Sequence, residues 1–378
     1  MKATGITSVY LFCISLFHPI LAPYVKSLGF NDLQLGIVFA IFPAVLIFAA
    51  PILGSISDHI GRKQVIIFGI GCQIMGIVLY MFDTYRPVIF FARLFESVAY
   101  AAVIYSGLAM MEDQLKDKVR GKFSGVALTI LQIGQLLAPV IGGLLADQYL
   151  KLPFVIAMVV LLISFIMLTF RSNNHRHRKI SKDDFRIWKK WKQFLKDRRL
   201  KGMAILGFVM HASIPLTFVF FPLFIIENFG LSFKYVGYAT FAYTFFHLLQ
   251  FLFGSIADRV GQWRGILFGT VMTGLGFIAL HFADTYWTFM AVLVFAGLGT
   301  AVWNVTATSF LSQIGEATKI EGSVLGEYVS FAKMGDLLSY IASGAIAYYL
   351  GIQTLMTVIG VAIILFSGAA YFYIRPQK

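Results

Sequence analysis

Residues 54–63 read GSISDHIGRK, and residues 254–263 read GSIADRVGQW. Five residues of the first stretch recur in the second at an interval of 200 positions: Gly54, Ser55, Ile56, Asp58 and Gly61 return as Gly254, Ser255, Ile256, Asp258 and Gly261. Both copies follow a long apolar run. A charged, glycine-punctuated stretch that returns after so long an interval indicates two copies of one large unit and excludes a solenoid of short repeats.

The composition indicates a chain that folds in a lipid bilayer. The sequence is 58% hydrophobic and 13% charged, whereas a soluble domain carries about 25% charged residues. Twelve apolar runs are long enough to cross a bilayer: 4–25, 33–53, 64–82, 87–111, 123–146, 152–170, 202–226, 235–253, 265–283, 287–311, 322–346 and 352–374. Each must satisfy its own backbone hydrogen bonds, and all are too long for barrel strands. The sequence therefore predicts an all-α polytopic membrane protein with twelve transmembrane helices.

The excess positive charge is concentrated in one connecting segment. The chain has a net charge of +13, and residues 171–201 hold thirteen Lys and Arg against three Asp, a net of +10. This bias places the segment, and with it both termini, in the cytoplasm. It also argues against a nucleic-acid partner. Compact loops favour the inner membrane of a prokaryote.

The repeat extends beyond the opening stretch. Gly29 and Gly36 match Gly230 and Gly237 at an offset of 201. We therefore expect two pseudo-symmetric six-helix bundles, residues 1–170 and 202–378, joined by a linker at 171–201. Parallel repeats of this kind place a substrate site at their interface, near the middle of the membrane.

The linker itself has helical features. Ser181 and Asp184 have the spacing of a capping box, and Phe185, Trp188, Trp191 and Leu195 recur at helical spacing among basic residues. This pattern predicts a basic amphipathic helix that anchors on anionic lipid headgroups. The alternative is a regulatory or partner-binding segment.

The stretch 54–63 resembles the signature loop G-x-L-A-D-R-x-G-R-K of the major facilitator superfamily, between its helices 2 and 3. The resemblance covers nearly the whole chain, because the second copy has the same place in the second half. It implies a gating loop in each half, made of Gly54, Asp58, Gly61, Arg62, Lys63, Gly254, Asp258, Arg259 and Gly261. Gly54 and Gly61 would allow a tight turn. The alternative is that these charges only end the helices and set the topology.

Two further stretches resemble the same superfamily. Residues 134–143, GQLLAPVIGG, are similar to its antiporter motif G-x-x-x-G-P-x-x-G-G, with Ala138 in place of a glycine. The matching residues are Gly134, Pro139, Gly142 and Gly143, and the resemblance implies export; ordinary small-residue packing is the alternative. In the fourth run, Arg93-Leu-Phe-Glu96-Ser97 is a weaker match to R-x-x-Q-G, whose arginine the family links with proton coupling.

Ionisable residues deep in a span are candidates for function. Arg93 and Glu96 can pair at i, i+3 on one span, and Lys333 and Asp336 can do so on another. Glu327 lies on the same span as Lys333. The candidates for proton coupling are Arg93, Glu96, Glu327 and Asp336, and the residues do not decide which acid carries the proton. The alternative is that each pair only satisfies itself.

The repeat also predicts residues of a central cavity. At an offset of 201, Lys333 falls on Gln132 and Asp336 on Gln135. We expect these four polar side chains to face one shared cavity. Further candidates for its lining are His211, Tyr100 and Trp303. Lone histidines in spans, including His18 and His247, are more often structural hydrogen-bond donors, and most aromatic side chains in such a chain only pack.

The sequence holds neither a phosphate-binding loop nor an H-E-x-x-H or cysteine metal site, so we expect a transporter without cofactor or metal, not an enzyme. We predict a monomeric secondary exporter that uses the proton gradient to expel small amphipathic or aromatic compounds, as in multidrug efflux. The alternatives are a dedicated exporter of a metabolite, lipid, sugar or siderophore, and a proton-coupled nutrient symporter.

Overall fold

The computed structural model describes residues 2–82, 85–114, 120–170, 191–192, 194–318 and 321–375, in which all regular secondary structure is helical. Side chains are described throughout these ranges except at 2–4, 51, 112–114, 120–131, 258, 316–318, 321–323 and 325. The chain forms two compact units. Unit 1 comprises residues 1–30, 37–185 and 231–238, and unit 2 comprises residues 31–36, 186–230 and 239–378.

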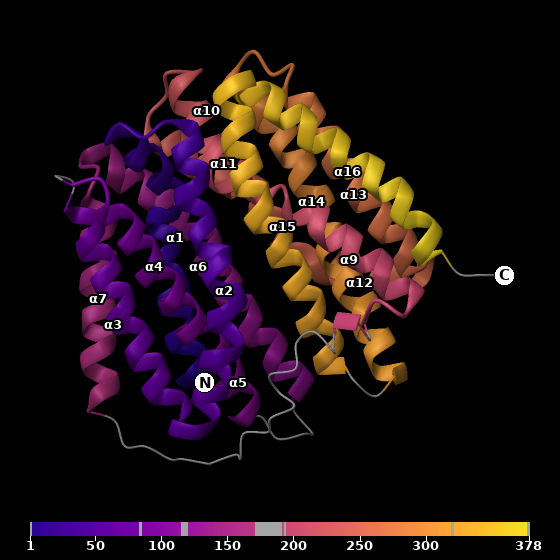
Figure 1. The fold of residues 1–378 in the computed structure, drawn as a ribbon, viewed down its shortest axis with the longest axis horizontal. Helices are drawn as coiled ribbons and strands as arrows, with labels where there is room; N and C mark the ends of the chain where they lie inside the picture. The colour runs from indigo at the N-terminus through magenta and orange to yellow at the C-terminus, as the bar shows by residue number, and fades with distance from the viewer. Residues whose placement is uncertain are drawn as a thin grey trace. The chain divides into compact units, whose positions relative to one another are not determined.

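The helices of the first half are coloured from indigo to magenta in Figure 1. In chain order they are α1 (Lys2–Ser27), α2 (Asp32–Ile60), α3 (Arg62–Met81), α4 (Val88–Tyr100), the π-helical turn η1 (Ala101–Tyr105), α5 (Ser106–Gln114), α6 (Arg120–Gln148) and α7 (Leu152–Thr169). Because α4, η1 and α5 follow one another without a break, they form a single span.

The helices of the second half follow the same order. They are α9 (Arg198–His211), the π-helical turn η3 (Leu216–Phe220), α10 (Phe221–Glu227), α11 (Phe233–Thr244), the 3₁₀ segment η4 (Phe245–Leu249), α12 (Gln250–Val260), α13 (Gln262–Leu280), α14 (Tyr286–Thr318), α15 (Glu321–Leu350) and α16 (Ile352–Ile374). Both π-helical turns interrupt a span, a position where such turns often mark functional sites.

The predicted all-helical membrane fold is confirmed. In the described part of the chain, ten helices or helix series are long and apolar enough to cross a membrane. The remaining two predicted spans are α6 and α15, which have 29 and 30 residues and are therefore also long enough. The side chains of Glu327, Lys333 and Asp336 add charges to α15.

Within each unit the helices pack in the same pattern. In unit 1, α1 packs on α6 and α7, while α3 packs on α4 and α7. In unit 2, α9 packs on α15 and α16, while α13 packs on α14 and α16. The repeat seen in the signature loops is therefore also a repeat of helix packing.

Aromatic side chains fill the centre of each unit. In unit 1, the rings of Phe17 and Phe154 stack with centroids 4.9 Å apart, and Tyr80 lies 6.1 Å from Phe154. In unit 2, the rings of Phe224 and Phe289 stack at 5.4 Å. These contacts join helices that are distant in sequence, because Phe17 lies on α1 and Phe154 on α7.

Glycines allow the closest helix contacts. A Cβ atom at Gly142 would overlap the Leu16 carbonyl oxygen of α1, and one at Gly143 would lie 2.5 Å from the Phe233 carbonyl oxygen. In unit 2, a Cβ atom at Gly36 would lie 2.9 Å from the Cα atom of Gly344. The sequence repeat relates Gly143 to Gly344, so both copies of this glycine lie at a backbone contact.

The end of the linker packs on α15. The ring centroids of Trp191 and Phe194 lie 5.4 and 5.6 Å from that of Phe331. Leu195, predicted on the apolar face, is 40% exposed, whereas Phe194 is 2% exposed. The Leu195 N–H group donates to the Trp191 carbonyl oxygen at 3.0 Å, as in a helical turn, and the anchoring role of this face stays a prediction. The predicted capping box and residues 171–190 lie outside the described residues.

Asp197 begins α9 as its N-cap. Its Oδ1 atom accepts hydrogen bonds from the backbone N–H groups of Arg199, at 2.8 Å, and Leu200, at 3.4 Å. Partial burial alone would raise the pKa of Asp197, but the hydrogen bonds and the positive charge of Arg199 hold it below its ordinary value. The cap therefore contributes most above the ordinary carboxyl pKa, and its contribution is lost as the pH falls through the lowered value.

We predict that Asp197→Ala destabilises the protein by about 1 kcal/mol, because two N–H groups of the first turn lose their acceptor. Asp197→Asn is the control, since its amide oxygen can still cap the helix. Thermal unfolding in detergent at neutral pH measures both variants. Equal melting temperatures for Asp197→Ala and the wild-type protein would show that the cap is not needed.

We also predict that Gly142→Ala lowers the yield of folded protein and its melting temperature, because the new methyl group must push α6 away from α1. Gly134→Ala is the matched control in the same helix, since its Cβ atom would lie 3.8 Å from the nearest atom, Phe12 Cβ. Size-exclusion profiles and thermal unfolding compare the two. Equal behaviour of both variants would contradict this packing.

Candidate functional site

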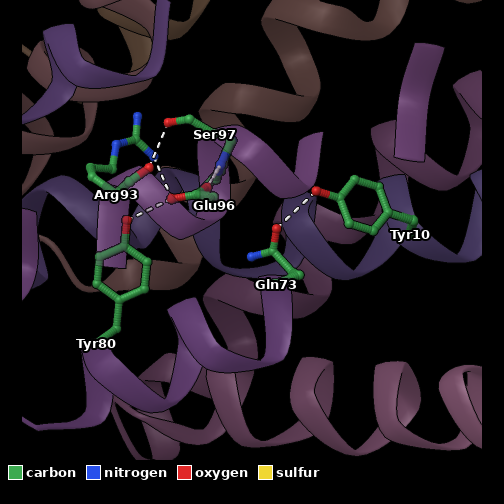
Figure 2. Close-up of polar contacts among 7 residues, drawn as sticks. Tyr10, Gln73, Tyr80, Arg93, Glu96 and Ser97 are labelled. Carbon is green, nitrogen blue, oxygen red and sulfur yellow. Dashed lines mark hydrogen bonds and ion pairs between the residues drawn. The ribbon is translucent and has the colours of Figure 1, made fainter. Parts of the chain in front are cut away.

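A fully buried carboxylate in unit 1 is surrounded by polar side chains (Figure 2). Glu96 on α4 is 0% exposed. Its Oε2 atom accepts hydrogen bonds from the Tyr80 hydroxyl at 2.6 Å and from Arg93 Nη1 at 2.7 Å, and its Oε1 atom lies 2.5 Å from His18 Nε2. Three helices, α1, α3 and α4, therefore meet at this one side chain. We call Glu96, Arg93, His18 and Tyr80 the Glu96 cluster.

Arg93 is held by its ion pair with Glu96 and by two aromatic rings. Its guanidinium group lies over the rings of Phe39, at 4.4 Å, and Phe42, at 5.0 Å. Cation–π contacts of this kind favour a charge that has been removed from water. The Ser97 hydroxyl donates to the Arg93 carbonyl oxygen at 2.5 Å, so its hydrogen bond is made to the backbone of its own helix. The predicted i, i+3 pair of Arg93 and Glu96 is present.

His18 connects the Glu96 cluster to its surroundings. Its side chain is 20% exposed, whereas those of Arg93 and Glu96 are 3% and 0% exposed. His18 is therefore the member best placed to exchange a proton with water.

A second buried carboxylate occupies unit 2. Asp336 on α15 accepts a hydrogen bond from Lys333 Nζ at 2.6 Å, and its other oxygen lies 2.8 Å from His211 Nδ1 on α9. The Asp336 side chain is 3% exposed, while those of His211 and Lys333 are 22% and 21% exposed. We call these three residues the Asp336 cluster. The predicted i, i+3 pair is again present.

Two buried donors lie near the Asp336 cluster. The ring of Trp303 on α14 packs edge-on against His211, with centroids 6.3 Å apart. Tyr328 on α15 packs against Gly207 on α9, one turn before His211, where a Cβ atom would lie 2.5 Å from its ring. Within the described residues, Trp303 Nε1 and the Tyr328 hydroxyl have no hydrogen-bond partner. A buried donor without a hydrogen-bond partner costs folding free energy. Such donors suit a site where a bound ligand can accept the hydrogen bonds.

The two clusters do not occupy equivalent places in the repeat. The Glu96 cluster joins α1, α3 and α4, whereas the Asp336 cluster joins α9 and α15. At the 200-residue offset of the signature loops, Arg93 and Glu96 correspond to Leu293 and Ala296. The halves therefore share a packing pattern but differ in their buried chemistry.

The signature stretches are mostly helical. α2 continues to Ile60 and α12 to Val260, so Gly61 and Gly261, with φ of 107° and 103°, are the joints to the next helices. The prediction that Gly54 also forms the turn was wrong: Gly54 lies inside α2, and a Cβ atom added there would have nothing within 4 Å.

Charged side chains close the first signature stretch. Asp58 forms an i, i+4 ion pair with Arg62, and Arg62 Nη1 also donates to the Ser57 hydroxyl at 2.8 Å. In the second copy Gly254 lies inside α12, Arg259 is exposed, and the side chain of Asp258 lies outside the described residues. Lys63 lies in the first turn of α3. The gating role of both stretches stays a prediction.

Several predicted cavity residues lie in different units. Gln132 and Gln135 lie on α6 in unit 1, and Lys333 and Asp336 lie on α15 in unit 2. Their shared cavity stays a prediction. Glu327 is buried on α15. Tyr100, at the end of α4, packs edge-on against Phe42 at 5.2 Å. In the antiporter stretch, Ala138 is fully buried and Pro139 lies inside α6.

The sequence did not single out Tyr80 and ranked His18 low. Tyr80 lies sixteen residues from Glu96 on another helix, so no local spacing links them. The one signal for His18 was its position beside Pro19 in an apolar run, which is shared by many structural histidines.

Comparison with known proteins identifies the family. The profile described as "Major Facilitator Superfamily" matches residues 3–246 and 203–378. The chain is 24% identical over 361 residues to the synaptic vesicular amine transporter of Homo sapiens, covering 93% of this chain and 68% of that protein. It is 23% identical over 342 residues to the quinolone resistance protein NorA of Staphylococcus aureus (strain MRSA252), covering 88% and 86%.

A solved structure has the same fold. The crystal structure of a point mutant of the nucleoside transporter NupG superimposes with a TM-score of 0.83 at 16% identity, covering 99% of both chains. Together with the apolar helices, these matches show an integral membrane protein that transports small molecules and is not an enzyme. The chain belongs to the Major Facilitator Superfamily.

Proposed function

We propose that this transporter is a proton-coupled exporter of small amphipathic or aromatic compounds. The observation that carries the proposal is the Glu96 cluster, in which a fully buried carboxylate is bonded to a partly exposed histidine from another helix. Support for export comes from the antiporter-like stretch 134–143 and from the similarity to a quinolone resistance protein.

The charges of the cluster suggest how a proton and a substrate compete. Arg93 is permanently charged and offsets the charge of Glu96, so the cluster is neutral when His18 is neutral and carries one positive charge when His18 is protonated. A buried net charge is unfavourable. A cationic or strongly polarised substrate nearby therefore favours loss of the proton, as an exchange of substrate for proton requires.

The Asp336 cluster has the same charge balance. Lys333 offsets Asp336, and His211 decides between neutral and positive. We assign this cluster to the substrate, because Trp303 and Tyr328 place an aromatic wall and two buried donors beside it. The amine-transporting relative favours amines as one substrate class.

The remaining parts of the proposal concern the setting. We place the protein as a monomer in the inner membrane of a prokaryote, with both termini in the cytoplasm and the proton gradient as its energy source. The basic linker would then contact anionic headgroups of the cytoplasmic leaflet. The signature stretches would act as gates in alternating access.

Proton-gradient-driven transport in proteoliposomes tests the proposal. An exporter exchanges protons for substrate, so an acidic interior should drive accumulation of ethidium, an aromatic cation, inside the liposomes. If the protein is instead a dedicated exporter of a metabolite, an acidic interior should drive the accumulation of another compound from a panel of candidate substrates. Accumulation driven by an acidic exterior would instead establish a symporter and contradict the proposal.

In the same assay, Glu96→Gln should reduce gradient-driven accumulation to that of protein-free liposomes, because the cluster loses its carboxylate. Ethidium binding by the purified variant should persist, and this binding separates loss of coupling from misfolding. Full gradient-driven transport by Glu96→Gln would contradict the assignment of the proton site.

A further inference from the structure

Unit 2 contains a cavity between α12 and α14 that neither cluster uses. Its volume is about 710 Å³, within the range of small-molecule sites. The side chains that line it are, apart from Val305, amides and hydroxyls: Gln250, Asn304, Thr308, Ser309, Ser312 and Gln313. We call this cavity the polar groove.

The position of these side chains in a membrane span indicates a wet or ligand-filled groove. Asn304, Thr308 and Ser312 follow one another at intervals of four residues and so lie on one face of α14. Asn304, Thr308 and Gln313 are exposed. Polar groups facing lipid would lose their hydrogen bonds to water at a considerable cost. This face of α14 is therefore suited to water or to a polar ligand.

The groove offers both donors and acceptors but no charge. Thr308 Oγ1 donates to the Asn304 carbonyl oxygen at 2.8 Å, which leaves its lone pairs free to accept. Ser309 accepts a hydrogen bond from Gln262 Nε2 at 2.7 Å, which orients its own hydroxyl hydrogen elsewhere. Amide side chains at Gln250 and Asn304 provide both functions. A charged ligand group would find no opposite charge among the lining residues. Hydroxyl, amide and carbonyl groups of a ligand would find hydrogen-bond donors and acceptors there.

Three polar residues of the groove have apolar counterparts in the first half. At the 200-residue offset, Asn304, Thr308 and Ser309 correspond to Ile104, Leu108 and Ala109. The first half has its charged pair elsewhere on the same span, at Arg93 and Glu96. The fourth span of the first half thus carries the ions, and its counterpart in the second half carries neutral hydrogen-bonding groups.

We propose that the polar groove binds the uncharged, hydrogen-bonding part of transported compounds. This role rests on the proposed transport function and adds to it a substrate class, namely neutral molecules or moieties with hydroxyl, amide or carbonyl groups. Gln250 directly follows the 3₁₀ segment η4, so its place in the groove depends on the geometry of that turn.

Equilibrium binding to the full chain in lipid nanodiscs tests the groove. The probes are radiolabelled chloramphenicol, an uncharged aromatic compound with hydroxyl and amide groups, and ethidium, a permanent cation. We expect Asn304→Leu combined with Thr308→Val to weaken chloramphenicol binding roughly tenfold, because each lost neutral hydrogen bond corresponds to a few-fold change in affinity. Ethidium binding should stay unchanged.

Two further variants keep the test independent of folding. Gln250→Leu alters the opposite wall of the groove on α12 and should weaken chloramphenicol selectively as well. Gln353→Leu removes an exposed amide of α16 outside the groove and should bind both probes like the wild-type protein. Retained ethidium binding shows that each variant is folded.

The proposed role of the groove is overturned if the wild-type protein does not bind chloramphenicol, or if the groove variants bind both probes equally well or lose both equally. Failure of the proposed function is a separate result, because proton-driven ethidium transport in liposomes measures coupling without reference to chloramphenicol. If the protein binds chloramphenicol in the groove but shows no proton exchange, the proposed role of the groove stands and the proposed export function fails.

Discussion

An ionised carboxylate inside a membrane-spanning bundle must have partners for both of its oxygen atoms, and much of this structure follows from that constraint. Removing one partner of a buried ion pair leaves an uncompensated charge. Glu96 therefore binds a cation from its own helix, a hydroxyl from α3 and a histidine from α1. The hydrogen bonds and ion pairs of Glu96 therefore join α1, α3 and α4 at one point.

The proposed transport function rests on the same constraint. In both clusters a fixed cation offsets the acid, and a histidine whose side chain is about one-fifth exposed contacts the acid. In the proposed function, gain or loss of one proton at this histidine changes the net charge of the cluster. A substrate can influence that equilibrium through its own charge without displacing the buried pair.

The repeat provides the frame, and its two copies have diverged in chemistry. Glycines such as Gly143 and Gly344 keep equivalent close contacts, whereas the ion pair of the fourth span has no counterpart in the tenth. Local features of this kind were predictable: apolar runs, i, i+3 ion pairs and small residues at contacts all follow from nearby sequence. Partners from other helices, such as Tyr80 and His18, were not, because helix packing and not spacing brings them to Glu96. The signature stretch was misjudged in detail because α2 continues through Gly54 to Ile60, and within the stretch only Gly61 has a positive φ.

The role of the Glu96 cluster as the site of the exchanged proton can be measured as the pH change when ethidium is added to purified protein in weakly buffered detergent solution. We expect the wild-type protein to release protons on binding, because a bound cation disfavours the protonated cluster. Glu96→Gln and His18→Gln should each bind ethidium and release fewer protons, because only His211 of the Asp336 cluster remains to release one. Unchanged proton release by both variants would contradict that role.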